Sequence, residues 1–138
     1  MIKRLHRILL LFLLFGLTAC SGEKTTDTAE LPKTEPRYEQ ISAEEAKSIM
    51  DTEKEYVIVD ARTEEEFAEG HIEGAILIPE YEIASRAKKE LPDKNALILV
   101  YCRSGRRSKI ASEELVKLGY TRVKEFGGII DWPYEIVK

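Results

Sequence analysis

Short apolar runs recur between residues 38 and 138 and are separated by amphipathic or turn-forming segments. Four runs rich in Val, Ile, Leu or Tyr predict strands, at residues 55–60, 74–79, 96–101 and 121–125. Runs of this length and composition are typical of strands buried on both faces of a parallel sheet. The run at 96–101, ALILVY, is the most apolar and predicts the central strand.

Helices are predicted between these strands. They lie at residues 42–50, in a segment that opens at Thr63 and stops at Gly70, at 81–91, at 108–118, and in a terminal helix that carries Trp132 after a turn at 126–128. The first two open with Ser or Thr followed three residues later by Glu, which is the capping-box spacing. A glycine stops a helix easily because it adopts the left-handed conformation without strain.

Alternating strands and helices predict an α/β fold, with a mainly parallel sheet covered by helices on both faces. This predicted domain spans residues 38–138, and no internal repeat is visible in it.

Composition and charge narrow the class of protein. A chain of 138 residues, 43% of them hydrophobic, supports one domain with its own core and is too apolar to be disordered. Two cysteines, Cys20 and Cys102, are too few for a disulfide scaffold, and the spaced Cys and His pairs of a structural zinc site are absent from the sequence. We therefore predict no cofactor and no metal.

The net charge is −4, and residues 20–138 hold 18 basic against 25 acidic side chains. Nucleic-acid binding requires a basic face, so the charge argues against a nucleic-acid partner.

The first 19 residues predict a secretory signal. Lys3, Arg4 and Arg7 precede an apolar stretch at 8–17, followed by small residues and Cys20. The stretch is too short for a permanent membrane helix, which needs about 20 apolar residues. Leu-Thr-Ala-Cys at its end resembles the lipobox of bacterial lipoproteins, which implies cleavage before Cys20 and lipidation of its thiol.

Residues 20–37 contain one large apolar residue, two prolines and many Thr and Glu, and we expect them to form a flexible tether. The expected location is the bacterial cell envelope, on the extracytoplasmic side of a membrane, with the lipid as the membrane contact. An ordinary secretory signal, in which Cys20 is incidental, is the alternative.

The segment CRSGRR, residues 102–107, combines three features of a reactive anion site; we refer to it as the Cys102 loop. Cys102 ends the most buried predicted strand, where ligands bind in open α/β sheets. A glycine-containing loop that enters a helix directs backbone N–H groups at an anion, and Arg103, Arg106 and Arg107 add positive charge. Such a site favours the thiolate, which is the reactive form of cysteine.

The loop length separates two chemistries. Cys-dependent phosphatases place an arginine six positions after the nucleophile, whereas here Arg107 is at the fifth position and Ser108 at the sixth. The shorter loop favours a sulfur atom carried on the cysteine over a tetrahedral phosphate.

CRSGRRS resembles the active-site loop of single-domain rhodaneses, which are thiosulfate sulfurtransferases. VIVDAR at 57–62, EFAEGHIEGAILIP at 66–79 and GGIIDW at 127–132 resemble other motifs of that family, in the same order. The resemblance covers residues 38–138 and implies the rhodanese-like fold, a persulfide on Cys102 as the catalytic step, and no cofactor.

The resemblance also implies roles for other residues. Its anion cradle matches Arg103, Ser104, Gly105, Arg106 and Arg107, with Arg107 supplying charge at the end of the loop. Asp60 is expected to tie down a neighbouring loop, His71 to be structural, and Trp132 to pack in the core or at the rim of a pocket.

Three functions follow, in order of preference. The first is a membrane-anchored sulfurtransferase that takes sulfur from a small anionic donor such as thiosulfate and passes it to cyanide or a thiol. The second is a non-enzymatic sulfur carrier or docking module, for which a protein sulfur acceptor is the expected partner. The third is a Cys-dependent phosphatase or arsenate reductase relative.

Overall fold

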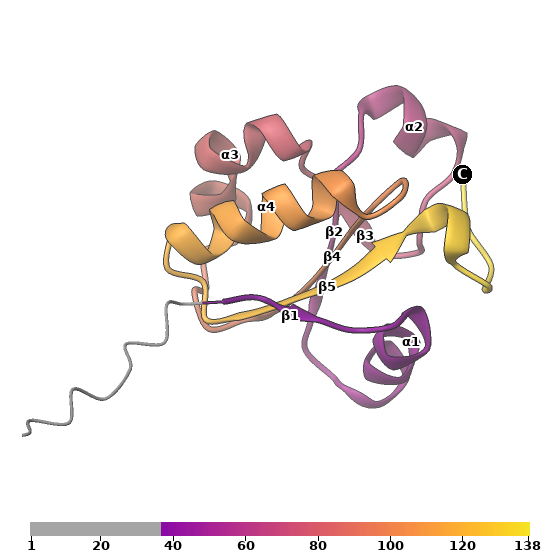
Figure 1. The fold of residues 1–138 in the computed structure, drawn as a ribbon, viewed down its shortest axis with the longest axis horizontal. Coiled ribbons are helices and arrows are strands. Elements are labelled where there is room, and N and C mark those ends of the chain that lie inside the picture. Colours follow the sequence, from indigo (N-terminus) through magenta and orange to yellow (C-terminus); the bar gives the residue numbers. More distant parts are fainter. Residues whose placement is uncertain (1–36) are drawn as a thin grey trace, which may run out of the picture. The chain divides into compact units, whose positions relative to one another are not determined.

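The computed structural model describes residues 37–138, and the predicted signal and nearly all of the predicted tether lie outside them. Five strands form one sheet: β1 (Glu39–Gln40), β2 (Val57–Asp60), β3 (Ala75–Leu77), β4 (Leu97–Cys102) and β5 (Arg122–Gly128). Their order is β1-β5-β4-β2-β3, and every pairing is parallel (Figure 1). The predicted α/β fold is confirmed, with β4 at the centre of the sheet.

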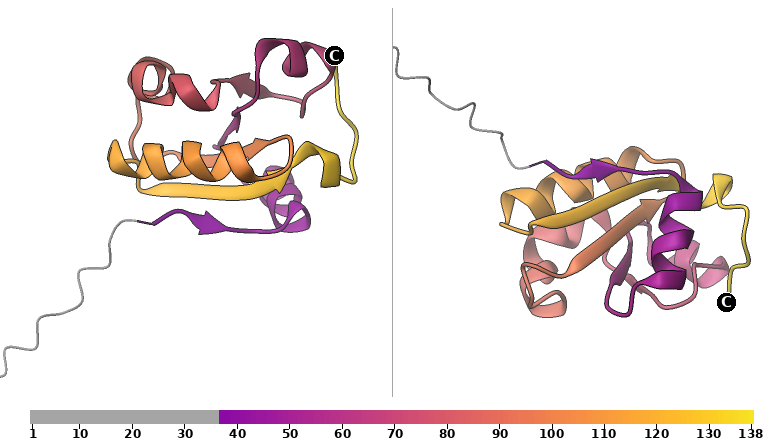
Figure 2. Two further views of the ribbon diagram at one scale, coloured as in Figure 1. Left: turned by 45° about the horizontal axis from the view of Figure 1, so that its top comes forward. Right: turned by 90° about the horizontal axis from the view of Figure 1, so that it is seen from below.

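Helices cover both faces of the sheet, as predicted (Figure 2). They are α1 (Ala43–Thr52), α2 (Glu64–Glu69), α3 (Ile83–Glu90) and α4 (Arg106–Lys117), with short 3-10 helices η1 (Glu80–Glu82) and η2 (Ile129–Asp131). Helices α3 and α4 pack on one face and α1 on the other. Both predicted capping boxes form, at Ser42 and at Thr63.

The side chains of β4 divide between two hydrophobic clusters, one on each face. Ile98, Val100 and Cys102 pack with residues of α3 and α4, whereas Leu97, Leu99 and Tyr101 pack with α1 and the C-terminal segment. All six are buried, which explains why the predicted strand is apolar without alternation. Cys102 therefore belongs to the core on the α4 side of the sheet.

The structure corrects the predicted elements at four points. Helix α4 begins at Arg106, two residues early, because Gly105 takes the left-handed conformation (φ 95°) and starts the helix without a capping side chain. The predicted turn at 126–128 belongs to β5, which continues through Gly128. The terminal helix is only η2, with Trp132 just after it, and β1 was not predicted. Within residues 37–138, no helix has the length and apolar character to cross a membrane.

Candidate active site

Cys102 lies at the carboxyl end of β4, where the strand gives way to the loop that enters α4. Its side chain is buried, with 1% of the residue exposed, and the Gly105 N–H donates to its sulfur at 3.1 Å. The pairing of β4 with β5 shifts register between Val100 and Cys102, which brings Cys102 opposite Gly128. The sulfur is thus held beneath a turn of backbone at the start of a 12-residue helix.

The surroundings of Cys102 favour its ionised form. Burial alone raises the pKa of the thiol, but hydrogen bonds from the Ser108 hydroxyl and from the N–H groups of Ser108, Ser104 and Gly105 outweigh it and hold the pKa below its usual value. The N-terminus of α4 adds its positive dipole end. Such surroundings favour the thiolate, which is the form of cysteine that acts as a nucleophile.

The Cys102 loop rests directly on the backbone of β5. A Cβ atom added to Gly128 would lie 2.1 Å from the Arg103 carbonyl oxygen, so only glycine fits there. The Ile130 N–H donates to the same oxygen at 3.2 Å. The backbone at Gly128 and Ile130, in the GGIIDW motif, therefore contacts the Cys102 loop and supports the conformation of its turn.

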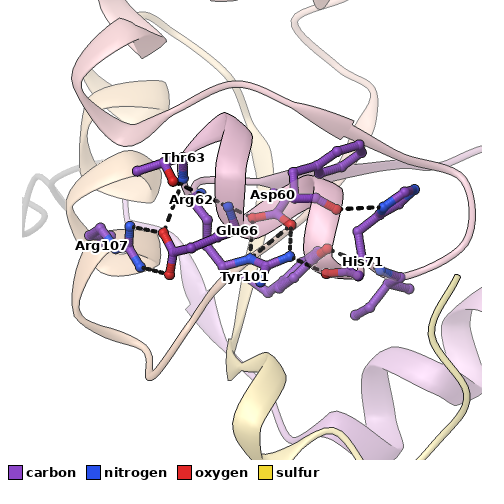
Figure 3. Close-up of polar contacts among 10 residues, drawn as sticks. Asp60, Arg62, Thr63, Glu66, His71, Tyr101 and Arg107 are labelled. Atoms are coloured by element: carbon purple, nitrogen blue, oxygen red, sulfur yellow. Dashed lines mark hydrogen bonds and ion pairs between the residues drawn. The ribbon is translucent and has the colours of Figure 1, made fainter. Parts of the chain in front are cut away.

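Arg107 forms a two-pronged ion pair with Glu66 of α2 (Figure 3). Its Nη1 and Nη2 atoms lie 2.6 and 2.8 Å from the two carboxylate oxygens. Hydrogen bonds from Arg107 lower the pKa of Glu66 to about 2, and the pair in turn raises the pKa of Arg107. The guanidinium of Arg107 thus links α4 to α2. Its positive charge, which the sequence predicted for the anion cradle, is compensated by Glu66.

The remaining polar residues of the Cys102 loop face solvent. Arg103, Ser104 and Arg106 are exposed, and neither Arg103 nor Arg106 has an ion pair within residues 37–138. Gly105 is buried beside the sulfur. Arg103 and Arg106 therefore lie exposed at the mouth of the site without an ion pair among the described residues. Arg107, the third arginine of the loop, is held by Glu66.

Asp60 and Arg62 form a second, fully buried ion pair at the end of β2 (Figure 3). Arg62 binds both oxygens of Asp60 and also donates to the Gly70 carbonyl at 2.7 Å, which ties the end of α2 to the sheet. His71 stacks on Phe67 and its Nδ1 lies 3.0 Å from the Phe67 carbonyl oxygen. These contacts are structural, as the sequence analysis expected for Asp60 and His71.

Trp132 packs against Phe126 and Tyr134, with 9% of the residue exposed. It also lines a cavity of about 740 Å³ beside α1, to which no residue of the Cys102 loop contributes. The cavity is therefore separate from the reactive thiol. In the part of the chain that the structure describes, no cluster of His, Cys, Asp or Glu could hold a metal ion.

Sequence reasoning missed three residues at the site. Ser108 was assigned only to the helix, Glu66 only to a capping box, and Glu125 only to a strand. Glu66 meets Arg107 across 41 positions of sequence, which no local pattern reveals. Glu125 carried a signal, because it shares the parity of the apolar Val123 in β5 and so points into the core.

Comparisons with known proteins agree with this geometry. The chain is 42% identical over 73 residues to thiosulfate sulfurtransferase PspE of Escherichia coli, covering 53% of this chain and 70% of that protein. It is 37% identical to the putative sulfur carrier protein YrkF of Bacillus subtilis, over 67% of this chain and half of that protein.

Solved structures resemble the fold as well. A rhodanese with anions from E. coli superposes with a TM-score of 0.57 at 40% identity, covering 60% of this chain and 98% of that one. A rhodanese-like domain protein from Staphylococcus aureus gives a TM-score of 0.61 at 34% identity, covering 70% and 93%. The rhodanese-like domain model matches residues 42–133, and the chain belongs to that family.

Proposed function

We propose that this protein is a sulfurtransferase that carries sulfane sulfur as a persulfide on Cys102. The observation that carries the proposal is the sulfur itself: a buried thiol with a lowered pKa, held at 3.1 Å by the Gly105 N–H. The similarity to a thiosulfate sulfurtransferase over 70% of that protein's length supports the same chemistry.

The proposed reaction has two displacements at sulfur. The Cys102 thiolate attacks the outer sulfur of thiosulfate, an S–S bond forms, and sulfite leaves with the electron pair of the broken S–S bond. A cyanide ion or a thiolate then attacks the outer sulfur of the persulfide. Cys102 leaves as the thiolate, which returns the site to its starting state.

The loop geometry suits both steps. The N–H groups of Ser104, Gly105 and Ser108 that stabilise the thiolate are placed to stabilise the persulfide anion as well. Arg103 and Arg106 at the mouth attract a doubly charged donor such as thiosulfate. Substrate binding by the Cys102 loop, residues 102–107, is thus divided between backbone donors inside and cations outside.

Steady-state turnover of thiosulfate and cyanide tests the proposal, with thiocyanate as the measured product. The wild type should turn over, and the Cys102→Ser variant should not. Hydrolysis of an aryl phosphate, measured on the same preparations, tests the phosphatase alternative. Phosphate release without thiocyanate formation would contradict the sulfurtransferase.

A sulfur-carrier role is the second candidate, and the rim of the site favours it. Ile130 is 61% exposed, and its backbone N–H donates to the Arg103 carbonyl, so a large apolar side chain lies exposed next to the Cys102 loop. A protein acceptor that presents a thiol would cover it. Persulfide transfer to a protein thiol, combined with slow turnover on cyanide, would support this role over the enzyme.

We also propose that the chain is anchored by a lipid on Cys20, in the cell envelope on the extracytoplasmic side of a membrane. The support is the charged start, the short apolar stretch and the Leu-Thr-Ala-Cys sequence. Two acyl chains give stable anchoring where one is marginal. Cys20→Ala should release the protein from the membrane fraction or leave it unprocessed; normal processing with unchanged membrane association would contradict the anchor.

Lipidation would leave Cys102 as the one free thiol in the processed chain, because the sequence contains only these two cysteines. No internal thiol could then resolve the persulfide, so the sulfur must leave to another molecule.

A further inference from the structure

A cavity lies on the face of the sheet opposite the Cys102 side chain, and the proposed function does not use it. It has a volume of about 740 Å³ and lies between α1, the start of β2 and residues 132–135. Small-molecule sites have volumes of about 300–1,000 Å³. The buried residues of its lining are all apolar: Ile58, Ile72 and Trp132. The apolar part of a ligand would therefore find a matching surface here.

One wall of the cavity is a corner formed by two aromatic rings. The ring centroids of Trp132 and Tyr134 are 4.9 Å apart, and the ring planes meet at 70°. Trp132 Nε1 donates to the Glu135 carbonyl at 3.4 Å, which folds the segment back on the indole. Beyond the corner, Val137 and His71 exchange two backbone hydrogen bonds, at 2.8 and 2.9 Å. The segment that carries both rings is therefore fastened to the domain at two points.

The aromatic corner has the chemistry to bind a cation. The face of an aromatic ring attracts positive charge, most strongly at Trp, and aromatic cages bind ammonium groups in this way. The protein already places one cation here, because the Lys47 ammonium lies 5.6 Å from the centroid of the Tyr134 ring. Among residues 37–138 no cation lies over the Trp132 ring. The corner therefore has room for a second positive group.

The rim of the cavity carries an excess of negative charge. Its charged residues are Lys47, Asp51, Glu73 and Glu135. Lys47 and Asp51 form an ion pair, whereas neither exposed glutamate has an ion pair in the part of the chain that the structure describes. Two negative charges thus remain without a counter-ion at the rim. They attract a cationic ligand and repel an anionic one.

We infer that this cavity is a second binding site, for a small organic cation: a protonated amine or a quaternary ammonium group joined to an apolar body. The apolar body packs on Ile58 and Ile72, and the positive group lies at the aromatic corner, near the two uncompensated carboxylates. The Cys102 loop has the opposite character, because Arg103 and Arg106 are exposed at its mouth. The two sites therefore select ligands of opposite charge, and the inference does not depend on the proposed function.

Fluorescence of Trp132 tests the inference, because this residue is the only tryptophan in the sequence. Three probes that share a hexyl chain are titrated into the purified full-length protein: hexyltrimethylammonium, uncharged hexanol and anionic hexanesulfonate. We expect a saturable change with hexyltrimethylammonium, at a concentration about tenfold lower than with hexanol, and the weakest binding with hexanesulfonate. No saturable change with the cation would overturn the inference, and so would equal affinity for the cation and either of the other probes.

Tyr134→Leu tests the aromatic corner. It removes the ring, keeps an apolar side chain and leaves the reporting tryptophan in place. Affinity for hexyltrimethylammonium should fall about three- to tenfold, and affinity for hexanol should change less. An equal fall for both probes would show that the ring supplies only apolar contact, which would overturn the inference.

The double variant Glu73→Gln with Glu135→Gln tests the rim. Affinity for hexyltrimethylammonium should fall about three- to fivefold at low ionic strength. Glu64→Gln with Glu113→Gln is the matched control, because it removes two exposed carboxylates outside the cavity and changes the net charge equally. The control should bind the cation as the wild type does. Equal weakening in the two double variants would show that net charge alone attracts the cation, and would overturn the inference. The wild-type titrations decide the matter independently of how any variant folds.

Discussion

Two buried carboxylates flank the central strand β4, and their surroundings differ in one respect. Asp60, at the end of β2, is fully buried and meets the guanidinium of Arg62 through both oxygens. Glu125, on β5, is 2% exposed and meets only uncharged donors. Asp60 therefore forms an ion pair that ties the end of α2 to the sheet. Glu125 instead connects β5 to Ser108 in the first turn of α4, without a cation among residues 37–138.

The comparison shows that burial alone does not define the role of a carboxylate. A compensated charge holds structure together, and removing one partner exposes the other to the low-dielectric interior. A carboxylate that meets only uncharged donors leaves no buried cation behind when it is neutralised, so its loss should cost less stability. The same isosteric change, carboxylate to amide, should thus lower the stability of the fold strongly at Asp60 and little at Glu125.

Asp60→Asn should have the largest effect on stability. It leaves the Arg62 cation buried without its counter-charge, which costs about 3–5 kcal/mol. Urea denaturation at neutral pH measures the loss. Glu82→Gln, which breaks the half-exposed pair with Arg86, is the control and should cost less than about 1 kcal/mol. Equal losses in the two variants would remove the distinction between compensated and surface charges.

Glu66→Gln should have an intermediate effect, because its pair with Arg107 is partly exposed, at 24% and 19% of the two side chains. Losing the charged hydrogen bonds should cost about 1.5–3 kcal/mol at neutral pH. The same denaturation experiment measures it.

The pair also predicts a pH dependence. Hydrogen bonds from Arg107 hold the pKa of Glu66 at about 2 in the folded protein, below its usual 4.5. The unfolded chain therefore binds the proton more readily, and the contribution of Glu66 to stability is present above pH 4.5 and lost as the pH falls toward 2. The difference in stability between wild type and Glu66→Gln should shrink over that range. A constant difference from pH 6 down to pH 2.5 would show that the ion pair is not its source.

Glu125→Gln should have the smallest effect on stability, below about 1 kcal/mol, because the amide still accepts from Gly127 and no unpaired cation is left behind. The thermal unfolding midpoint should stay within a few degrees of the wild type. A loss of stability as large as that of Asp60→Asn would show that Glu125 stabilises the fold as much as Asp60 does, and would contradict the difference between the two carboxylates.

The sequence predicted the elements whose signals are local. Strand β4 was identified from its unbroken apolar run, and α1 and α2 from their capping boxes. The start of α4 was misplaced because Gly105 begins the helix through backbone conformation, and no capping side chain marks it. The end of β5 was misplaced because glycine usually signals a turn, whereas Gly128 is required by the close approach of Arg103.

The candidate site was predicted in the same uneven way. Cys102 and the Cys102 loop form one continuous segment, so their proximity follows from the sequence. The residues that contact this segment from elsewhere in the chain do not follow from the sequence. Glu66, which pairs with Arg107, is 41 positions away, and Glu125, which bonds to Ser108, is 17 positions away. Which arginine faces solvent and which is compensated depends on tertiary contacts, and only the folded chain reveals it.

The proposed function requires Cys102 to carry sulfane sulfur in a cradle of backbone donors. The most direct measurement is the mass of the peptide of residues 95–103 after the wild-type protein is incubated with thiosulfate and digested without reductant. We expect a gain of one sulfur atom on that peptide, which is lost on addition of cyanide and absent from Cys102→Ser. An unmodified peptide at every thiosulfate concentration, from a protein whose Cys102 still reacts with iodoacetamide, would contradict it.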